Sequence, residues 1–295
     1  MMRKIEELAC GKVNLHLDIV GREENGYHLV NNVMQTISLC DRLILEKIDS
    51  DQIFAECNRE GVPGDDRNLA VRAALLFRER VDGVGGLRIE IDKQIPMAAG
   101  MAGGSADAAA VLRGLNRMHG NPLSVEELCS LGTKLGADVP FCVVGGTSYA
   151  NGRGDRLHPF PSMPYGYLVC ACEGEGVSTP WAYSLLDQKY GNFSEKEAYT
   201  PCSMDALRDA CLKGSLEDVA SSMYNIFEEP VLSQRPVAAE LLMLLKKSDS
   251  LGAMMSGSGP SVFGIFADRE SAEKASELLC CRGYRAYLCT PVNPK

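Results

Sequence analysis

The chain has 295 residues, of which 45% are hydrophobic and 23% charged, a composition typical of a globular protein with one large core or two smaller ones. Its formal net charge of −9 disfavours a nucleic-acid partner, because an acidic chain gains nothing from releasing phosphate counterions. The N-terminal stretch has no apolar signal-peptide core, and no apolar run is long enough to cross a bilayer, so we expect a cytoplasmic protein with no membrane partner.

The cysteines and histidines predict neither a disulfide framework nor a zinc site. There are twelve cysteines, but no CxxC pair occurs, and Cys280 and Cys281 are adjacent. The four histidines are scattered, whereas zinc sites need paired Cys or His spacings. We therefore expect reduced, mostly buried thiols. Three histidines are assigned to structural or surface positions: His16, His119 and His158.

Hydrophobic periodicity predicts strands and helices in the first half of the chain. Alternating apolar and polar residues predict strands over 13–20, 33–48 (one strand or two) and 86–95. Helical spacing predicts helices over 68–81, 105–120 and 124–136. A capping box from Ser124 to Glu127 marks the start of the last helix. Asn151-Gly152 predicts the turn of a hairpin over 146–160.

The second half continues the alternation after a proline-rich seam, PFPSMP, at 159–164. Strands are predicted over 167–174, 253–257, 261–267 and 284–290. Helices are predicted over 179–187, 203–213, 235–248 and 270–281. This pattern favours an α/β or α+β class, and the closing order of strand, strand, helix and strand is typical of a ferredoxin-like layer.

The stretch PMAAGMAGGSADAAAVL, residues 96–112, joins a predicted strand to an alanine-rich helix. Backbone N–H groups and a helix N-terminus at such a junction bind anions, and small residues let a phosphate approach the backbone. The stretch lacks both the GxGxxG order of a dinucleotide fold and the Lys of a Walker loop. A regular strand and helix bracket it, which disfavours a linker. From this pattern alone, a phosphate loop and a tight turn into a close-packed helix both stay open.

Four segments in the same order resemble the GHMP kinase superfamily. They are KVNLHLDIVGREENGYHLV at 12–30, IPMAAGMAGGSADAAAVLRGLN at 95–116, LGADVPF at 135–141 and MSGSGPSVFGIF at 255–266. The GR…GYH pattern of the first segment resembles the branch that phosphorylates the 2-hydroxyl of 4-diphosphocytidyl-2-C-methyl-D-erythritol. It separates that branch from the galacto-, homoserine and mevalonate kinases.

The resemblance implies a two-domain α+β fold. A ribosomal-protein-S5-like N-terminal domain would span 1–160, and a ferredoxin-like C-terminal domain 161–295. The implied activity is an ATP-dependent kinase of the non-mevalonate isoprenoid pathway, with Mg²⁺ as cofactor and a CDP-linked small molecule as substrate. Monomer and homodimer both stay open.

The resemblance also assigns roles to individual residues. Asp138 is implied as the general base, with Lys12 facing it and offsetting charge on the transferred phosphate. Ser105 is a candidate Mg²⁺ ligand. The implied ATP phosphate loop comprises Pro96, Met97, Ala98, Ala99, Gly100, Met101, Ala102, Gly103, Gly104, Ser105 and Ala106. The implied substrate contacts are Asn14, Tyr27, His28, Tyr183, Gly257 and Ser258.

Within these contacts, Tyr27 would stack on cytosine and His28 would hydrogen-bond it, while Tyr183 or Trp181 would supply a second stacking face.

The loop departs from the common family form G-L-G-G-G-S-S-D-A-A. Met101, Ala102 and Ala106 stand where Leu, Gly and the second Ser are usual. An Ala at 102 is expected to keep the cradle if its φ is negative. Two other functions stay open: another small-molecule GHMP kinase of sugar, homoserine or mevalonate type, and a non-catalytic nucleotide- or metabolite-binding relative.

Overall fold

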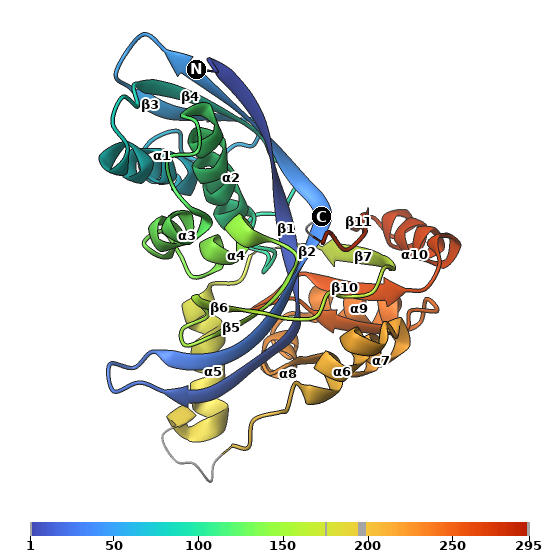
Figure 1. The fold of residues 1–295 in the computed structure, drawn as a ribbon. Helices are drawn as coiled ribbons and strands as arrows, with labels where there is room; N and C mark the ends of the chain where they lie inside the picture. The colour runs from blue at the N-terminus through green and yellow to red at the C-terminus, as the bar shows by residue number, and fades with distance from the viewer. Residues whose placement is uncertain (1, 175, 194–198, 294–295) are drawn as a thin grey trace. The chain divides into compact units, whose positions relative to one another are not determined.

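The computed structural model describes residues 2–174, 176–193 and 199–293. Contacts within the chain divide the protein into two compact units. Unit 1 comprises 1–11, 39–97 and 102–145, and unit 2 comprises 12–38, 98–101 and 146–295. The long strands β1 (Lys4–Arg22) and β2 (His28–Ile48) contribute residues to both units (Figure 1). Both strands extend well beyond their predicted ranges.

In unit 1, a sheet is covered by helices (Figure 1). β4 (Gly86–Asp92) pairs antiparallel with β2 and parallel with β3 (Ile53–Cys57). The helices are α1 (Leu69–Arg80), α2 (Gly103–Met118), α3 (Val125–Thr133) and α4 (Asp138–Val144). The capping box of Ser124 and Glu127 is confirmed. The sequence interpretation missed β3 and α4, and α4 contains Pro140. Pro140 lies in the first turn, where a missing N–H breaks no helical bond.

The α2 helix packs closely in unit 1 because its residues are small. Twelve of its sixteen residues are buried, among them the alanines at 108–110. At Gly114, an added Cβ would lie 2.5 Å from Leu45 Cδ1 and 3.0 Å from Glu7 Cγ. A side chain at Gly114 would therefore push α2 away from β1 and β2.

A buried ammonium group ties the end of β4 to α2. Lys93 Nζ donates to Asp41 Oδ2 at 2.5 Å and to Asp107 Oδ2 at 2.6 Å, and all three side chains are at most 6% exposed. Asp41 Oδ1 also accepts from the backbone N–H groups of Gln94 and Ile95. Burial raises the pKa of Asp107 to about 7, against the opposing effect of Lys93. This cluster fixes the chain on both sides of the 96–102 stretch.

Cys10 and Cys40 form a disulfide, so the prediction that all thiols are reduced is wrong for this pair. They lie on β1 and β2, which are neighbours in the sheet, with a Cα–Cα distance of 3.9 Å. Thirty residues separate them in sequence, and periodicity alone does not place them opposite each other. The other ten cysteines, all within the described ranges, form no disulfide.

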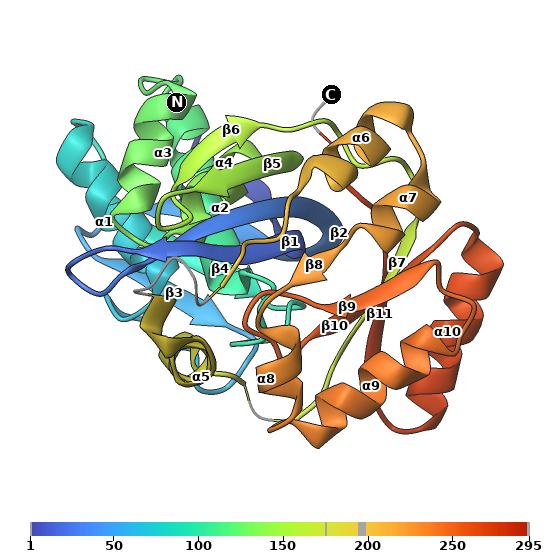
Figure 2. The ribbon, with the colours of Figure 1, turned by 90° about the horizontal axis from the view of Figure 1, so that it is seen from below.

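In unit 2, the ferredoxin-like expectation is confirmed. The four-stranded sheet has the order β11 (Arg285–Cys289), β7 (Tyr167–Cys172), β10 (Val262–Phe266), β9 (Gly252–Met255), with every neighbouring pair antiparallel. Numbered along the chain, this is the order 4-1-3-2. α9 (Pro236–Lys246) and α10 (Arg269–Cys281) pack on this sheet (Figure 2).

The rest of unit 2 surrounds the second half of β1 and the first half of β2. β5 (Thr147–Asn151) pairs with β2 and forms the predicted hairpin with β6 (Arg156–Pro159), and β8 (Tyr224–Asn225) pairs parallel with β1. The helices are α5 (Thr179–Tyr190), α6 (Asp205–Lys213), α7 (Leu216–Ser221) and α8 (Glu228–Leu232), with a 3₁₀ turn at Gly191–Phe193. In the ranges that the structure covers, no helix has the length and apolarity needed to span a membrane.

His16 on β1 is fully buried beside the ring of Tyr224, at 5.7 Å between ring centroids. Neither of its ring nitrogens has a hydrogen-bond partner among the described residues. Burial lowers its pKa to about 4, because the charged imidazolium loses its hydration. The structural assignment of His16 agrees with this position.

Replacing the buried ammonium tests the Lys93 cluster. In Lys93→Met, Asp41 and Asp107 lose their counter-charge, and we expect the free energy of unfolding to fall by about 3–5 kcal/mol. Lys274→Met is the matched control, because Lys274 makes an exposed pair with Glu270 and should cost less than about 1 kcal/mol. Urea unfolding measures both. Equal losses in the two variants would refute the role of the cluster.

His16 predicts a pH dependence of stability. The unfolded chain protonates this histidine near its ordinary pKa of 6.5, whereas the folded chain does so only near 4. Folding stability is therefore lost as pH falls from about 6.5 to about 4, by up to about 3 kcal/mol. In His16→Phe, this loss of stability between pH 6.5 and pH 4 should disappear. His158→Phe, at an exposed histidine, should retain it. Parallel stability–pH curves for wild type and His16→Phe would contradict the prediction.

Candidate active site

Two glycine-containing loops of unit 2 lie in direct contact. Gly100 approaches the 256–259 turn so closely that an added Cβ would lie 2.2 Å from the Ser256 carbonyl oxygen. Gly100 also has a φ of +78°, which favours glycine. Ser256 Oγ donates to the Gly100 carbonyl at 3.0 Å, and Ser261 N donates to the Ala99 carbonyl at 3.2 Å. The predicted loop residues at 98–101 and the predicted Gly257 are therefore brought together.

Lys12 and Asn14 on β1 border these two loops. Lys12 N donates to the Met101 carbonyl at 3.1 Å, and its buried ammonium donates to Asn14 Oδ1 at 2.6 Å. Asn14 Nδ2 donates to Asn32 Oδ1, and Ser256 Oγ lies 3.3 Å from Asn14 Oδ1. Since alternate residues of a strand share a face, β1 places a cation and an amide side by side next to the glycine loops.

The chain from Ala102 onward forms the N-terminus of α2 in unit 1. Ala102 is the N-cap, and its φ is +57°, so the condition of a negative φ is not met. Alanine adopts this left-handed conformation at a cost of about 1 kcal/mol relative to glycine. The first helical bond runs from Ala106 N to the Ala102 carbonyl. The amides of 103–105 precede that bond and have no acceptor within the helix, which leaves them suited to an anion.

The start of α5 is attached to the same loop of unit 2. Val177 N donates to the Ala98 carbonyl at 3.1 Å, and Gly176 has no room for a side chain beside Ala98. The hydroxyls of Thr179 and Ser258 lie 3.4 Å apart. The predicted residue Ser258 therefore lies beside the first turn of α5.

Further along α5, two side chains contact His28. The Tyr183 ring lies 4.6 Å from the His28 ring between centroids, at an interplanar angle of 32°. Asp187 Oδ1 lies 2.7 Å from His28 Nε2. Trp181 lies instead under the Arg235 guanidinium, at 5.0 Å. Of the two aromatic candidates, Tyr183 is the one that lies beside His28.

Tyr27 precedes His28 in the turn between β1 and β2. Its side chain is 57% exposed, and the Arg153 guanidinium lies 4.1 Å from the ring centroid. An exposed aromatic ring beside a cation suits a stacked base and a nearby phosphate.

Asp138 is the first residue of α4 in unit 1 and is half-buried. The residues that follow it, Val139–Val143, are buried and anchor this short helix. The carboxylate is thus held at a helix N-terminus, where negative charge is favoured.

The donor set for a metal ion is small. Within the described ranges, no group of three or more His, Cys, Asp or Glu side chains is arranged to hold a metal. Ser105 is half-buried in the first turn of α2, and the buried Asp107 Oδ1, two residues on, has no hydrogen-bond partner. Oxygen donors of this kind fit Mg²⁺, which in kinase sites takes few protein ligands and several phosphate or water oxygens.

Sequence reasoning missed Lys93 and Asp187 near the predicted site residues. Lys93 lies three residues before Pro96, and an added Cβ at Gly103 would be 3.1 Å from its Nζ. A Lys at the end of an alternating strand pattern, three residues before the loop, was the available signal for the first. Asp187 lies four residues, about one helical turn, after Tyr183, and that spacing was the signal for the second.

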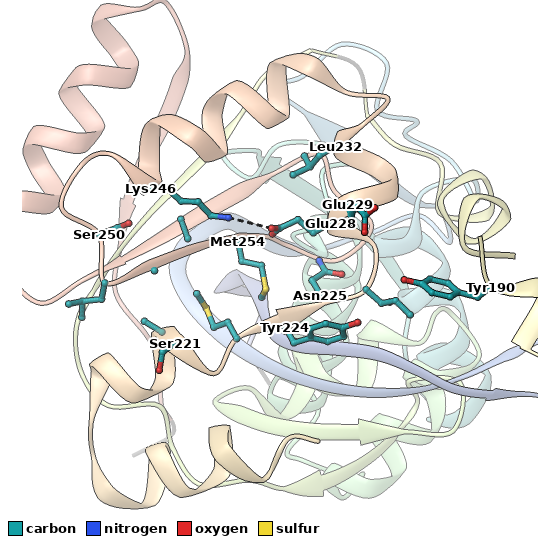
Figure 3. A pocket seen from close by; sticks show the side chains of 16 residues that line it. Tyr190, Ser221, Tyr224, Asn225, Glu228, Glu229, Leu232, Lys246, Ser250 and Met254 are labelled. Carbon is teal, nitrogen blue, oxygen red and sulfur yellow. Dashed lines mark ion pairs between the residues drawn. The ribbon is translucent and has the colours of Figure 1, made fainter. Parts of the chain in front are cut away.

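A separate pocket of about 690 Å³ lies within unit 2, between α8, α9, β8 and β9 (Figure 3). Tyr190, Tyr224, Met254 and the ion pair of Lys246 with Glu228 line it. It contains none of the predicted site residues.

Comparison with known proteins identifies the family. The family models for the GHMP kinases N terminal domain and the GHMP kinases C terminal region match residues 68–146 and 207–285. A 4-diphosphocytidyl-2-C-methyl-D-erythritol kinase from Caldicellulosiruptor saccharolyticus is 40% identical over 271 residues, covering 92% of this chain and 91% of that protein. One from Acaryochloris marina is 43% identical over 275 residues, covering 90% and 88%.

Solved structures support the same family assignment. A 4-(cytidine 5'-diphospho)-2C-methyl-D-erythritol kinase superposes with a TM-score of 0.81 at 32% identity, covering 98% of this chain and all of that one. Homoserine kinase from Cytophaga hutchinsonii, at 18% identity and a TM-score of 0.74, shares the fold and covers 99% and 96%. The two-domain GHMP kinase fold is confirmed. The chain belongs to the GHMP kinases and, among them, to the family of 4-diphosphocytidyl-2-C-methyl-D-erythritol kinases.

Proposed function

We propose that this chain transfers the γ-phosphoryl group of ATP to the 2-hydroxyl of 4-diphosphocytidyl-2-C-methyl-D-erythritol, giving the 2-phosphate and ADP in the non-mevalonate isoprenoid pathway. The names of relatives about 40% identical over most of the chain support this activity. The structural observation that supports this activity most directly is the packing of the 98–101 and 256–259 loops against Lys12 and Asn14. We also propose that the chain divides into domains over 1–160 and 161–295. The two matched family ranges lie on either side of residue 160, which supports this division.

The loop at 96–106 would hold the ATP phosphates. Its residues Ala98, Gly100 and Ala102 have positive φ, so the backbone turns repeatedly before α2 begins. Small side chains and the first amides of a sixteen-residue helix form the kind of cradle that binds phosphates. Ser105, in the first turn of α2, would be a ligand of Mg²⁺. When bound, that ion would neutralise charge on the phosphate oxygens.

Lys12 and Asp138 would carry out the chemistry on the acceptor. The Asp138 carboxylate would accept the proton of the 2-hydroxyl as the oxygen bonds to phosphorus. The Lys12 ammonium, held by Asn14, would offset charge that develops on the transferred phosphoryl group. Tyr27 and His28 would bind the cytosine, with the Tyr183 ring packed beside that of His28.

Substrate competition tests the activity. We expect ADP release with the cytidyl substrate and none with homoserine, mevalonate or a simple sugar. ADP release with one of those alcohols, and none with the CDP-linked substrate, would instead support another small-molecule GHMP kinase. Binding of both ligands without any ADP release would support a non-catalytic relative.

Removing the base tests Asp138. Asp138→Asn retains the shape of the side chain but accepts a proton poorly, so we expect kcat to fall by about 10²–10⁴-fold with both ligands still bound. Calorimetry would measure binding, and coupled ADP release would measure turnover. Asp82→Asn, at an exposed loop carboxylate, is the control and should retain full kcat. Unchanged turnover in Asp138→Asn would remove this residue from the mechanism.

Removing the exposed ring tests Tyr27. Stacking on a base is worth about 1–3 kcal/mol, so Tyr27→Ala should raise KM for the cytidyl substrate by about 5- to 150-fold. KM for ATP should not change. Tyr165→Ala is matched, because that ring is also exposed, at 69%. A rise in KM for ATP equal to that for the cytidyl substrate would contradict a base-stacking role.

A further inference from the structure

His28 is held by a carboxylate from another part of unit 2. His28 begins β2, whereas Asp187 lies near the end of α5, and the two meet with 2.7 Å between Nε2 and Oδ1. The His28 side chain is 8% exposed and that of Asp187 is 21% exposed. At this distance and burial, the contact is a well-formed hydrogen bond rather than a loose surface pair.

The second oxygen of Asp187 also has a partner. Arg22 Nη2 lies 3.6 Å from Asp187 Oδ2, and Arg22 Nε donates to the Gly26 carbonyl at 3.0 Å. The guanidinium therefore connects the carboxylate to the turn that carries Tyr27 and His28. With one oxygen at Arg22 and the other at His28, the carboxylate has a defined orientation.

Aromatic rings also pack against the imidazole ring of His28. Tyr183 packs on it at 4.6 Å, and Phe193 contacts it edge-on at 5.7 Å between centroids. Tyr183 is supported from behind by Phe227, at 4.9 Å. A flip of the ring about χ2 would put Cε1 in place of Nε2 and break the bond to Asp187.

The partner of Nε2 determines the chemical character of Nδ1. An ionised carboxylate only accepts hydrogen bonds, so Nε2 must carry the proton. In a neutral imidazole, Nδ1 then has no proton and is an acceptor. The two nitrogens point in nearly opposite directions, so Nδ1 faces away from Asp187, on the side of the ring nearer the backbone of the Tyr27–His28 turn.

We propose that Asp187 is a positioning residue that holds the His28 proton on Nε2 and presents Nδ1 as an acceptor, thereby selecting a pyrimidine with an amino group over one with a carbonyl. This inference rests on the proposed function, because it assumes that His28 faces the base. Cytosine offers a donor at its 4-amino group, whereas uracil has an acceptor carbonyl there. A site built to bond one polar group rejects the analogue that leaves it unpaired.

Two variants separate positioning from a structural role. In Asp187→Asn, the amide can donate to Nε2, so the His28 proton is free to move to Nδ1. We expect KM for the cytidyl substrate to rise about tenfold, from the loss of one hydrogen bond to a buried group, with kcat at saturation retained. The preference for the cytidyl over the uridyl form of the substrate should narrow. Asp187→Glu, which keeps an acceptor, should restore part of the preference. Asp209→Asn, at an exposed carboxylate on α6, should behave as wild type.

The tautomer is measured directly by ¹⁵N NMR of the imidazole nitrogens, with His28→Gln identifying the His28 signals. The proposal expects an Nε2–H tautomer in the wild-type enzyme and a mixture in Asp187→Asn. An Nδ1–H tautomer or an imidazolium in the wild type would overturn it, as would an unchanged cytidyl-to-uridyl preference in a folded Asp187→Asn. Failure of the proposed function looks different, because the wild type would then fail to phosphorylate either nucleotide form while the NMR result stood independently.

Discussion

The close approach of two backbones at Gly100 and Ser256 organises unit 2 around the candidate site. Only glycine fits at position 100, because any Cβ would overlap the Ser256 carbonyl. That contact places the 98–101 loop against the 256–259 turn, and the loop in turn receives a backbone hydrogen bond from Lys12. The position of the Lys12 ammonium therefore depends on a glycine far away in sequence. A substitution at Gly100 would displace the backbone that orients it, even though no catalytic atom would be lost.

The 98–101 loop, which would hold phosphates, is also linked to the part of unit 2 that would bind the base. Ala98 accepts from Val177, and α5 begins two residues later and runs to Tyr183 and Asp187, which contact His28. The helix is therefore fixed at its N-terminus by the glycine loop and along its length by the His28 ring. Small movements of the loop would be transmitted to Tyr183 and Asp187 through one rigid element, because a regular helix bends little over twelve residues.

Much of this arrangement could be predicted from the sequence where the signal was local. Period-2 and period-3.6 patterns, the capping box at Ser124 and the glycine-rich stretch before α2 each depend on neighbouring residues, and the structure has the corresponding elements. The missed features depend on pairings across the chain: Cys10 with Cys40, Lys93 with Asp41, and His28 with Asp187. A single sequence can mark such residues as candidates, but it does not show which distant residues meet, so these pairings were not predicted. The positive φ of Ala102 was missed for another reason, because alanine usually avoids that conformation.

The Lys93 cluster also bears on how a loop without its own lysine would bind phosphates in the proposed site. Lys93 lies beside Gly103, yet its charge is compensated by two carboxylates with which it shares hydrogen bonds of 2.5 and 2.6 Å. The cluster therefore braces the helix start without supplying net positive charge. In a P-loop, one lysine both completes the loop and contacts the phosphates. In the proposed site those two tasks would be separate: Lys93 would brace the helix, and Lys12, backbone amides and a divalent ion would compensate the phosphate charge. Separating them lets the loop consist of small residues, which is the condition for the close contact at Gly100.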